Sequence, residues 1–149
     1  MIERVEAATE LQAFCEERGW SFCFIGGLAL QHWGEPRLTL DVDATLLTGF
    51  GREATFVATL LERFSARASS AAAFAGRHRV LLIRSSTGIP FDVALGGLPF
   101  EAEAIRRSRL VFLGGDVPLR LCSAEDLVVM KAFADRGRDW LDIEGVLIR

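Results

Sequence analysis

Residues 24–47 read F-I-G-G-L-A-L-Q-H-W-G-E-P-R-L-T-L-D-V-D-A-T-L-L. The pair Gly26-Gly27 closes one apolar run, and a second apolar run carries Asp41 and Asp43. Alternate side chains of a strand project to the same face, so these two carboxylates point together, roughly 7 Å apart. Two such acids repel each other and lose hydration in an apolar strand. A fold keeps such a pair where a cation lies between the carboxylates, and this pair suits Mg²⁺. Glycines between a strand and a helix let backbone N–H groups approach a phosphate. The stretch therefore predicts a combined phosphate and metal site.

The composition is that of a single globular domain covering residues 1–149. Half of the residues are hydrophobic and a quarter are charged, which excludes a disordered chain. No apolar run is long enough to span a bilayer, and the acidic N-terminus does not resemble a signal peptide, so we expect no membrane association. The net charge of −3 argues against a broad electrostatic grip on nucleic acid. Three cysteines without a C-x-x-C pattern favour buried free thiols in a reducing cytoplasm.

Hydrophobic periodicity predicts an alternation of helices and strands without a linker that would divide the chain. We expect strands at residues 20–25, 39–47, 80–85, 89–95, 109–113 and 117–121, and helices at residues 2–18, 28–33, 52–64, 99–107, 123 to about 137, and 138 onward. Strands 80–85 and 89–95 should form a hairpin around a short turn. The Ala- and Ser-rich residues 66–75 are ambiguous and are expected to be the least ordered part.

Two further charged residues stand out. Asp92 lies inside the apolar run I-P-F-D-V-A-L, where an unpaired acid would be costly to bury. Lys131 is the single lysine in a chain with sixteen arginines, which favours a position that needs an ammonium group.

The order of Ile25-Gly26-Gly27, thirteen residues and Asp41-x-Asp43 resembles the signature of the DNA polymerase β-like nucleotidyltransferase superfamily. The resemblance implies an α/β (α+β) fold with a mixed central sheet flanked by helices. It also implies that Asp92 supplies a third catalytic carboxylate from the strand beside the D-x-D strand, a pairing that periodicity does not predict. The three carboxylates would hold two Mg²⁺ ions and catalyse transfer of a nucleoside monophosphate from an NTP to an acceptor hydroxyl, with Asp92 taking up the hydroxyl proton. The alternative is a tight turn followed by two surface acids.

The sequence of residues 26–43 resembles one branch of this superfamily in particular, the AbiEii-like bacterial nucleotidyltransferases. These are often encoded as half of a toxin–antitoxin or phage-defence pair. Arg37 and Thr39 match its Arg-x-Ser/Thr-x-Asp-x-Asp run, and Lys131 and Arg138-Asp139 match its late helix. By resemblance, Lys131 contacts the nucleotide phosphates and Asp139 orients the late helix or the nucleotide. The expected nucleotide-binding residues are Gly26, Gly27, Arg37, Thr39, Lys131 and Asp139.

Three functions stay open at this point. The first is a nucleotidyltransferase toxin that modifies RNA, such as tRNA, or protein, and that pairs with a small cognate protein. The second is an aminoglycoside-type nucleotidyltransferase with a small-molecule acceptor, and the third is a non-catalytic nucleotide-binding or antitoxin-like module. The presence of all three carboxylates favours an active enzyme. Members of the AbiEii-like branch usually continue into a helical domain that grips the acceptor, so this chain is either a minimal version or borrows its acceptor site from a partner. We expect the residues from about 123 to 149 to pack on or beside the core.

Overall fold

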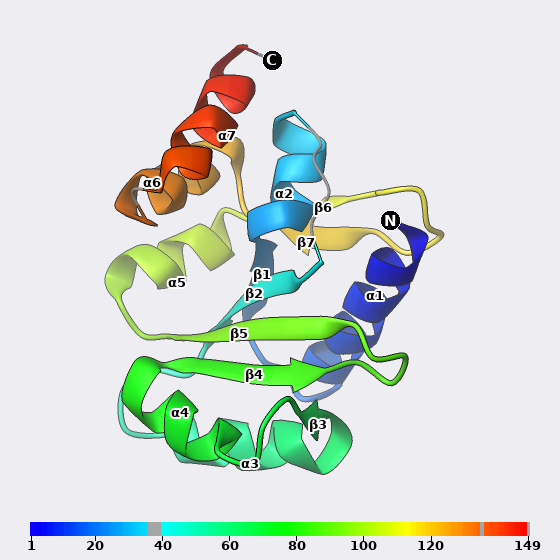
Figure 1. The fold of residues 1–149 in the computed structure, drawn as a ribbon, viewed down its shortest axis with the longest axis vertical. Helices are drawn as coiled ribbons and strands as arrows, with labels where there is room; N and C mark the ends of the chain where they lie inside the picture. The colour runs from blue at the N-terminus through cyan, green and yellow to red at the C-terminus, as the bar shows by residue number, and fades with distance from the viewer. Residues whose placement is uncertain (36–39, 135, 149) are drawn as a thin grey trace.

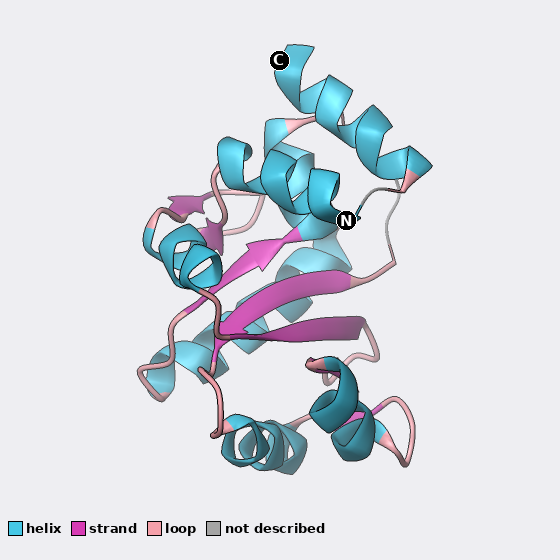
Figure 2. Cartoon of the chain, turned by 90° about the vertical axis from the view of Figure 1, so that its left-hand side faces the viewer, coloured by secondary structure: helices cyan, strands magenta, loops and turns pink. Residues whose placement is uncertain are grey.

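A mixed sheet forms the centre of the computed structural model, which describes residues 1–35, 40–134 and 136–148 (Figure 1). Seven strands of the described chain follow the order β3-β4-β5-β2-β1-β7-β6. The strands are β1 (Phe22–Ile25), β2 (Val42–Leu47), β3 (Ser65–Ala66), β4 (Val80–Arg84), β5 (Pro90–Gly96), β6 (Arg109–Val111) and β7 (Leu119–Leu121). The helices are α1 (Ile2–Glu17), α2 (Gly26–Trp33), α3 (Glu53–Arg63), α4 (Ala71–His78), α5 (Pro99–Arg106), α6 (Ala124–Ala134) and α7 (Gly137–Ile148). They flank the sheet on both sides (Figure 2), as the resemblance implied.

Strand alternation places the main core on one face of the sheet. Val42, Ala44 and Leu46 of β2 are buried and pack, with the matching residues of β4 and β5, against α1, α3 and α4. Neighbouring residues of a strand point to opposite faces, so Asp43 and Asp92 project from the other face. The same alternation that fills the core therefore delivers both acids to one side.

A smaller apolar cluster covers part of that second face. It joins β1 to α2, α5 and α6, and its buried members are Cys23, Ala29, Leu30, Ile105, Cys122 and Leu127. Trp33 at the end of α2 packs against the cluster, and its indole N–H donates a hydrogen bond to the carbonyl of Cys122 at 2.8 Å. This packing fixes α2, and with it the glycine turn that begins the helix, over the edge of β1.

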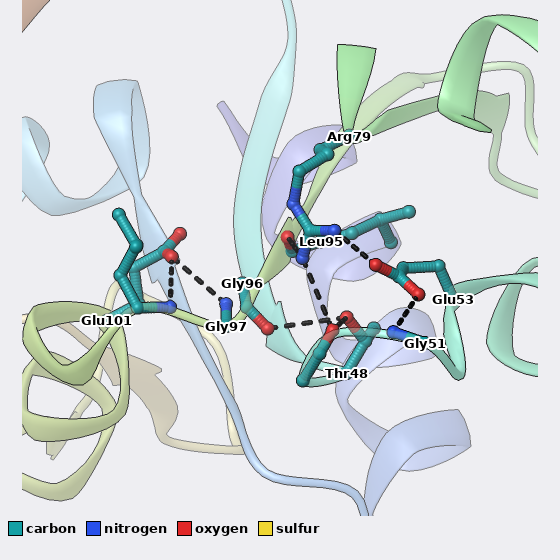
Figure 3. Close-up of polar contacts among 10 residues, drawn as sticks. Thr48, Gly51, Glu53, Arg79, Leu95, Gly96, Gly97 and Glu101 are labelled. Atoms are coloured by element: carbon teal, nitrogen blue, oxygen red, sulfur yellow. Dashed lines mark hydrogen bonds and ion pairs between the residues drawn. The ribbon is translucent and has the colours of Figure 1, made fainter. Parts of the chain in front are cut away.

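Polar contacts clamp the far ends of β2 and β5 (Figure 3). The Thr48 amide donates to the carbonyl of Gly96 at 3.0 Å, and the Thr48 hydroxyl reaches the same oxygen at 3.3 Å. The Arg79 guanidinium donates to the carbonyl of Leu95 at 2.6 Å and pairs with Glu53. These contacts tie the two strands together at the ends away from their acids, and so they fix the register in which the acids meet.

Among the local expectations that were wrong, two have a clear physical cause. The first strand begins at Phe22 rather than at residue 20, because Gly19 turns in the left-handed region at φ +66° and Trp20 packs edge-on against Phe14 instead of joining the sheet. Residues 66–75 are not the least ordered part, since they include the end of β3 and the start of α4. Alanine has the highest intrinsic helix propensity, and the buried Ala71 and Ala75 anchor the helix to the core.

The three cysteines are free and buried, as expected. Burial raises the pKa of Cys15 and of Cys23 to about 12 and raises the pKa of Cys122 as well, so all three thiols stay protonated and unreactive near neutral pH. Within the described ranges, every helix is too short or too polar to cross a bilayer.

Candidate active site

Asp43 and Asp92 lie directly beside each other in the sheet. Strands β2 and β5 pair in parallel with these two residues in register, and neighbouring strands are about 4.8 Å apart. Asp41 lies two residues before Asp43, and all three acids line one cavity of about 600 Å³. The strand pairing that the resemblance implied is therefore observed. One detail differs: β2 begins at Val42, so Asp41 lies directly before the strand rather than within it.

The glycine turn faces the same acids. Gly26 begins α2 in the left-handed region at φ +59°, and both Gly26 and Gly27 line the cavity. A Cβ atom on Gly26 would overlap Oδ2 of Asp43. The missing side chain therefore lets the Asp43 carboxylate lie against the backbone at the start of the helix, where the first N–H groups have no partner within the helix.

Asp43 is electrostatically strained in the absence of a cation. Burial, followed by the negative charges of Asp92 and Asp41, raises the pKa of Asp43 from 3.8 to about 6, and the positive charges of Lys131 and Arg136 act in the opposite direction. Such a shift is the expected behaviour of a carboxylate gathered with others of like charge. The cavity thus concentrates negative charge that a bound cation would offset.

Asp92 already contacts a cation of the protein. Its Oδ1 accepts a hydrogen bond from Nη1 of Arg67 at 2.5 Å, and the same Nη1 lies 3.1 Å from the carbonyl oxygen of Phe91. Arg67 directly follows β3, in the segment whose sequence was ambiguous. No sequence pattern pointed to this partner, because Asp92 lies 25 residues further along the chain and no periodicity links the two residues.

Lys131 lies in a buried ionic network between α6 and α7. Its Nζ is 3.0 Å from Oδ2 of Asp142 and 3.4 Å from Oδ1 of Asp139, and the lysine side chain is only 8 % exposed. The two carboxylates thus give the buried ammonium its ionic partners. Lys131 and Asp139 also line the cavity. Contact between Lys131 and a nucleotide phosphate stays a prediction, while a role for Asp139 in orienting the late helix agrees with its contacts.

Two arginines also line the cavity, Arg136 just before α7 and Arg138 in its first turn, and neither was among the expected site residues. Nε of Arg136 donates to Oδ2 of Asp139 at 2.6 Å, and the Arg136 amide donates to the same oxygen at 3.1 Å. Burial acts to raise the pKa of Asp139, but the hydrogen bonds from Arg136 outweigh it and hold this pKa below its ordinary value. Asp139 is therefore an ionised anchor that fixes Arg136 at the rim.

Arg37 and Thr39, which were expected at the nucleotide, lie outside the described residues. Their predicted roles stay predictions.

The donor set of the cavity fits a divalent cation in its chemistry. Three carboxylates provide the hard oxygen ligands that Mg²⁺ prefers, and Asp43 is destabilised by the charges that such an ion would neutralise. As the side chains stand, with Asp92 bonded to Arg67, no group of three or more His, Cys, Asp or Glu residues in the described part of the chain is arranged to hold a metal ion.

Comparison with known proteins identifies the fold. No model of a protein family matches the chain, and no curated protein matches it in sequence. Among solved structures, the chain is similar to an antigenic nucleotidyltransferase-like protein from Paracoccidioides brasiliensis, with a TM-score of 0.59 and 14% identity over 97% of this chain and 73% of that one. It is also similar to the lincosamide antibiotic adenylyltransferase LnuA bound to lincomycin, with a TM-score of 0.55 and 11% identity over 95% and 94% of the two chains. A third similar structure is ANT(2")-Ia in complex with adenylyl-2"-tobramycin, with a TM-score of 0.57 and 15% identity over 98% and 88%. The chain therefore has the nucleotidyltransferase fold, with a mixed central sheet flanked by helices.

Proposed function

We propose that this protein is a Mg²⁺-dependent nucleotidyltransferase that transfers a nucleoside monophosphate from an NTP to a hydroxyl group of an acceptor. The observation that carries the proposal is the in-register pair of Asp43 and Asp92, which shares one cavity with the Gly26-Gly27 turn. The similarity in fold to two adenylyltransferases supports it.

The residues of the cavity divide the work of such a transfer. Divalent cations held by Asp41, Asp43 and Asp92 would supply charge neutralisation for the triphosphate and acidify the acceptor hydroxyl. Asp92 accepts the hydroxyl proton, directly or through water, while the acceptor oxygen forms a bond to the α-phosphorus. The bond from that phosphorus to the bridging oxygen breaks, and pyrophosphate leaves with the electron pair. Catalysis of this kind consists mainly of positioning and charge neutralisation.

The nucleotide phosphates would lie between the glycine turn and the α6–α7 connection. The first N–H groups of α2, at Gly26 and Gly27, are suited to bind an anion at a helix N-terminus. Arg136 and Arg138, which line the same cavity, add positive charge. Lys131 contributes indirectly, because its ion pairs with Asp139 and Asp142 hold α7 in place beside the cavity. Arg37 and Thr39 join this set through the sequence resemblance alone.

For the biological setting, we propose the toxin of a toxin–antitoxin pair, acting in the cytoplasm as a single domain on RNA or protein beside a small cognate partner. The proposal rests on the resemblance of the G-G…D-x-D segment and of Lys131 and Asp139 to the AbiEii-like branch. A small-molecule acceptor is the second candidate, because two structures of similar fold are adenylyltransferases described with antibiotics. The two arginines at the C-terminal end of α5 are neutralised by acids and so add little to the binding of an RNA backbone: Arg106 pairs with Glu103, and Arg107, which follows the helix, pairs with Asp126.

A transfer assay distinguishes these acceptors. The protein is incubated with Mg²⁺ and each NTP labelled at the α-phosphate, together with total RNA, a protein extract, or lincomycin and tobramycin. We expect label to move to one acceptor class and pyrophosphate to be released, whereas label at the γ-phosphate must not be transferred. Label on a macromolecule supports the toxin setting, and label on an antibiotic supports the second candidate. A protein that binds NTP but labels no acceptor would instead be the non-catalytic module.

Nucleotide binding is expected to stabilise the fold. A ligand that binds only the folded state at about 100 times its dissociation constant adds about 2.7 kcal/mol to the free energy of unfolding. For a chain of this size, the melting temperature should rise by about 5 °C or more with saturating Mg²⁺-NTP. Thermal unfolding with Mg²⁺ alone, and with NTP in EDTA, provides the controls. An unchanged melting temperature with every NTP at millimolar concentration would count against a nucleotide site.

A further inference from the structure

Arg67 forms an ion pair with Asp92, the third carboxylate of the candidate site, from outside the cavity. Its Nη1 lies 2.5 Å from Oδ1 of Asp92 and donates also to the carbonyl of Phe91. Its backbone N–H donates to the carbonyl of Leu82 at 3.1 Å, so its backbone is held against β4. Arg67 is not among the residues that line the cavity.

The sheet places this arginine on the side of Asp92 opposite to the other acids. Asp92 stands between Asp43 of β2 and Leu82 of β4, and Arg67 is anchored on the β4 side. The carboxylate of Asp92 therefore has a protein cation on one flank and the cluster of like charge on the other. Both partners are partly accessible, with side-chain exposures of 23% for Arg67 and 33% for Asp92, so solvent and ions can reach the pair.

We propose that Arg67 is a positioning residue that competes with divalent cations for Asp92. It holds the Asp92 carboxylate while the cavity contains no cation, and its side chain must release or share Oδ1 when a cation binds. This inference rests on the proposed function, because it treats Asp92 as a ligand. Its consequence is that the protein without nucleotide binds divalent ions weakly, and the triphosphate, which carries its own Mg²⁺, favours the exchange.

The charge balance gives the direction of the effect. The guanidinium of Arg67 repels a second cation. It also stabilises the Asp92 carboxylate in the metal-free protein, so that a divalent ion has to compete for this ligand. Removing the guanidinium takes away both effects. Replacement of Arg67 by glutamine should therefore raise the affinity for a divalent ion, whereas a purely structural arginine would leave this affinity unchanged or lower it.

The experiment measures Mn²⁺ binding to the nucleotide-free protein by the loss of the free-ion paramagnetic resonance signal at constant pH and ionic strength. We expect Arg67→Gln to bind Mn²⁺ about fivefold more tightly than the wild type or better. Arg67→Lys retains the charge and should stay close to the wild type. The matched control is Arg63→Gln, which removes the same charge four residues away, where the arginine pairs with Glu10 at 2.9 Å instead of with a site acid.

The possible outcomes separate this proposal from the proposed function. Equal or weaker Mn²⁺ binding by folded Arg67→Gln, with binding still abolished by Asp92→Asn, would overturn the role of Arg67 alone. Absence of Mn²⁺ binding in the wild type and in every variant would overturn both. If Arg67→Gln does not fold, as judged by circular dichroism, Arg67→Met decides: it keeps a long side chain without the charge, so tighter Mn²⁺ binding than in the wild type supports the competition and unchanged or weaker binding refutes it.

Discussion

Replacement of Asp43 by asparagine is expected to lower nucleotidyl transfer by at least about a thousandfold and to make the metal-free protein more stable. The loss of rate corresponds to about 4 kcal/mol of transition-state stabilisation. The gain in stability has a separate cause, since burial and the charges of Asp92 and Asp41 raise the pKa of Asp43 to about 6. Above that pH, keeping this carboxylate ionised costs the folded state on the order of 3 kcal/mol. An asparagine side chain carries no charge, so this cost disappears.

The pH dependence of unfolding checks the sign. A carboxyl group whose pKa is raised on folding stabilises the folded state below its ordinary pKa of 3.8, and that contribution is lost as the pH rises to about 6. Thermal unfolding in EDTA should show this loss for the wild type between about pH 4 and pH 6 and a smaller one for Asp43→Asn. The exposed Asp116 provides the matched control, because Asp116→Asn makes the same chemical change away from the cavity. A drop of roughly 3–5 kcal/mol in Asp43→Asn would mark Asp43 as a structural ion-pair partner instead.

Replacement of Gly26 by alanine is expected to abolish measurable transfer and to destabilise the protein by about 2–4 kcal/mol. Two causes combine. The backbone at Gly26 has φ +59°, which is unfavourable for any residue with a Cβ, by about 1–2 kcal/mol. The added Cβ would also overlap Oδ2 of Asp43 and lie 3.0 Å from its Cγ, so the carboxylate has to leave its position. The substitution therefore damages the fold and the site through one contact.

Gly19 separates the two causes. It has a similar backbone, φ +66°, but a Cβ there would meet no atom within 4 Å, so Gly19→Ala should show only the strain of the left-handed conformation. Melting curves in EDTA and the transfer assay are run on both variants. If Gly26→Ala is as stable as Gly19→Ala and retains transfer, the close approach of Asp43 to the glycine turn has no functional importance.

Sequence reasoning was most successful where the relevant residues are close together in the chain. The glycine turn and the two acids of the D-x-D run fall within one strand–helix–strand unit, where spacing and strand alternation carry the information. The position of Asp92 beside Asp43 could not be obtained this way, because strand pairing over long separations leaves no periodic signal. The resemblance to a family predicted this pairing of strands, and the structure confirms it.

The remaining parts of the site escaped the sequence for physical reasons. The contact of Arg67 with Asp92 depends on where the irregular segment after β3 lies against β4, and the Ala- and Ser-rich sequence around it is compatible with several conformations. Lys131 was expected to contact phosphates, yet its ammonium is engaged by Asp139 and Asp142, contacts that arise only when α6 and α7 pack together. Side-chain partnerships between elements require the tertiary structure.

The pairing of β2 with β5 also has a consequence for the time at which activity can arise during synthesis. The ribosome releases the β1–β2 unit, with Asp41 and Asp43, well before Asp92, and the cavity wall formed by α6 and α7 emerges later still. Pairing over such separations carries a high contact order and forms late in folding. A nascent chain therefore exposes two clustered acids but no complete centre. If the proposed function holds, nucleotidyl transfer by a nascent chain has to await the synthesis of α6 and α7.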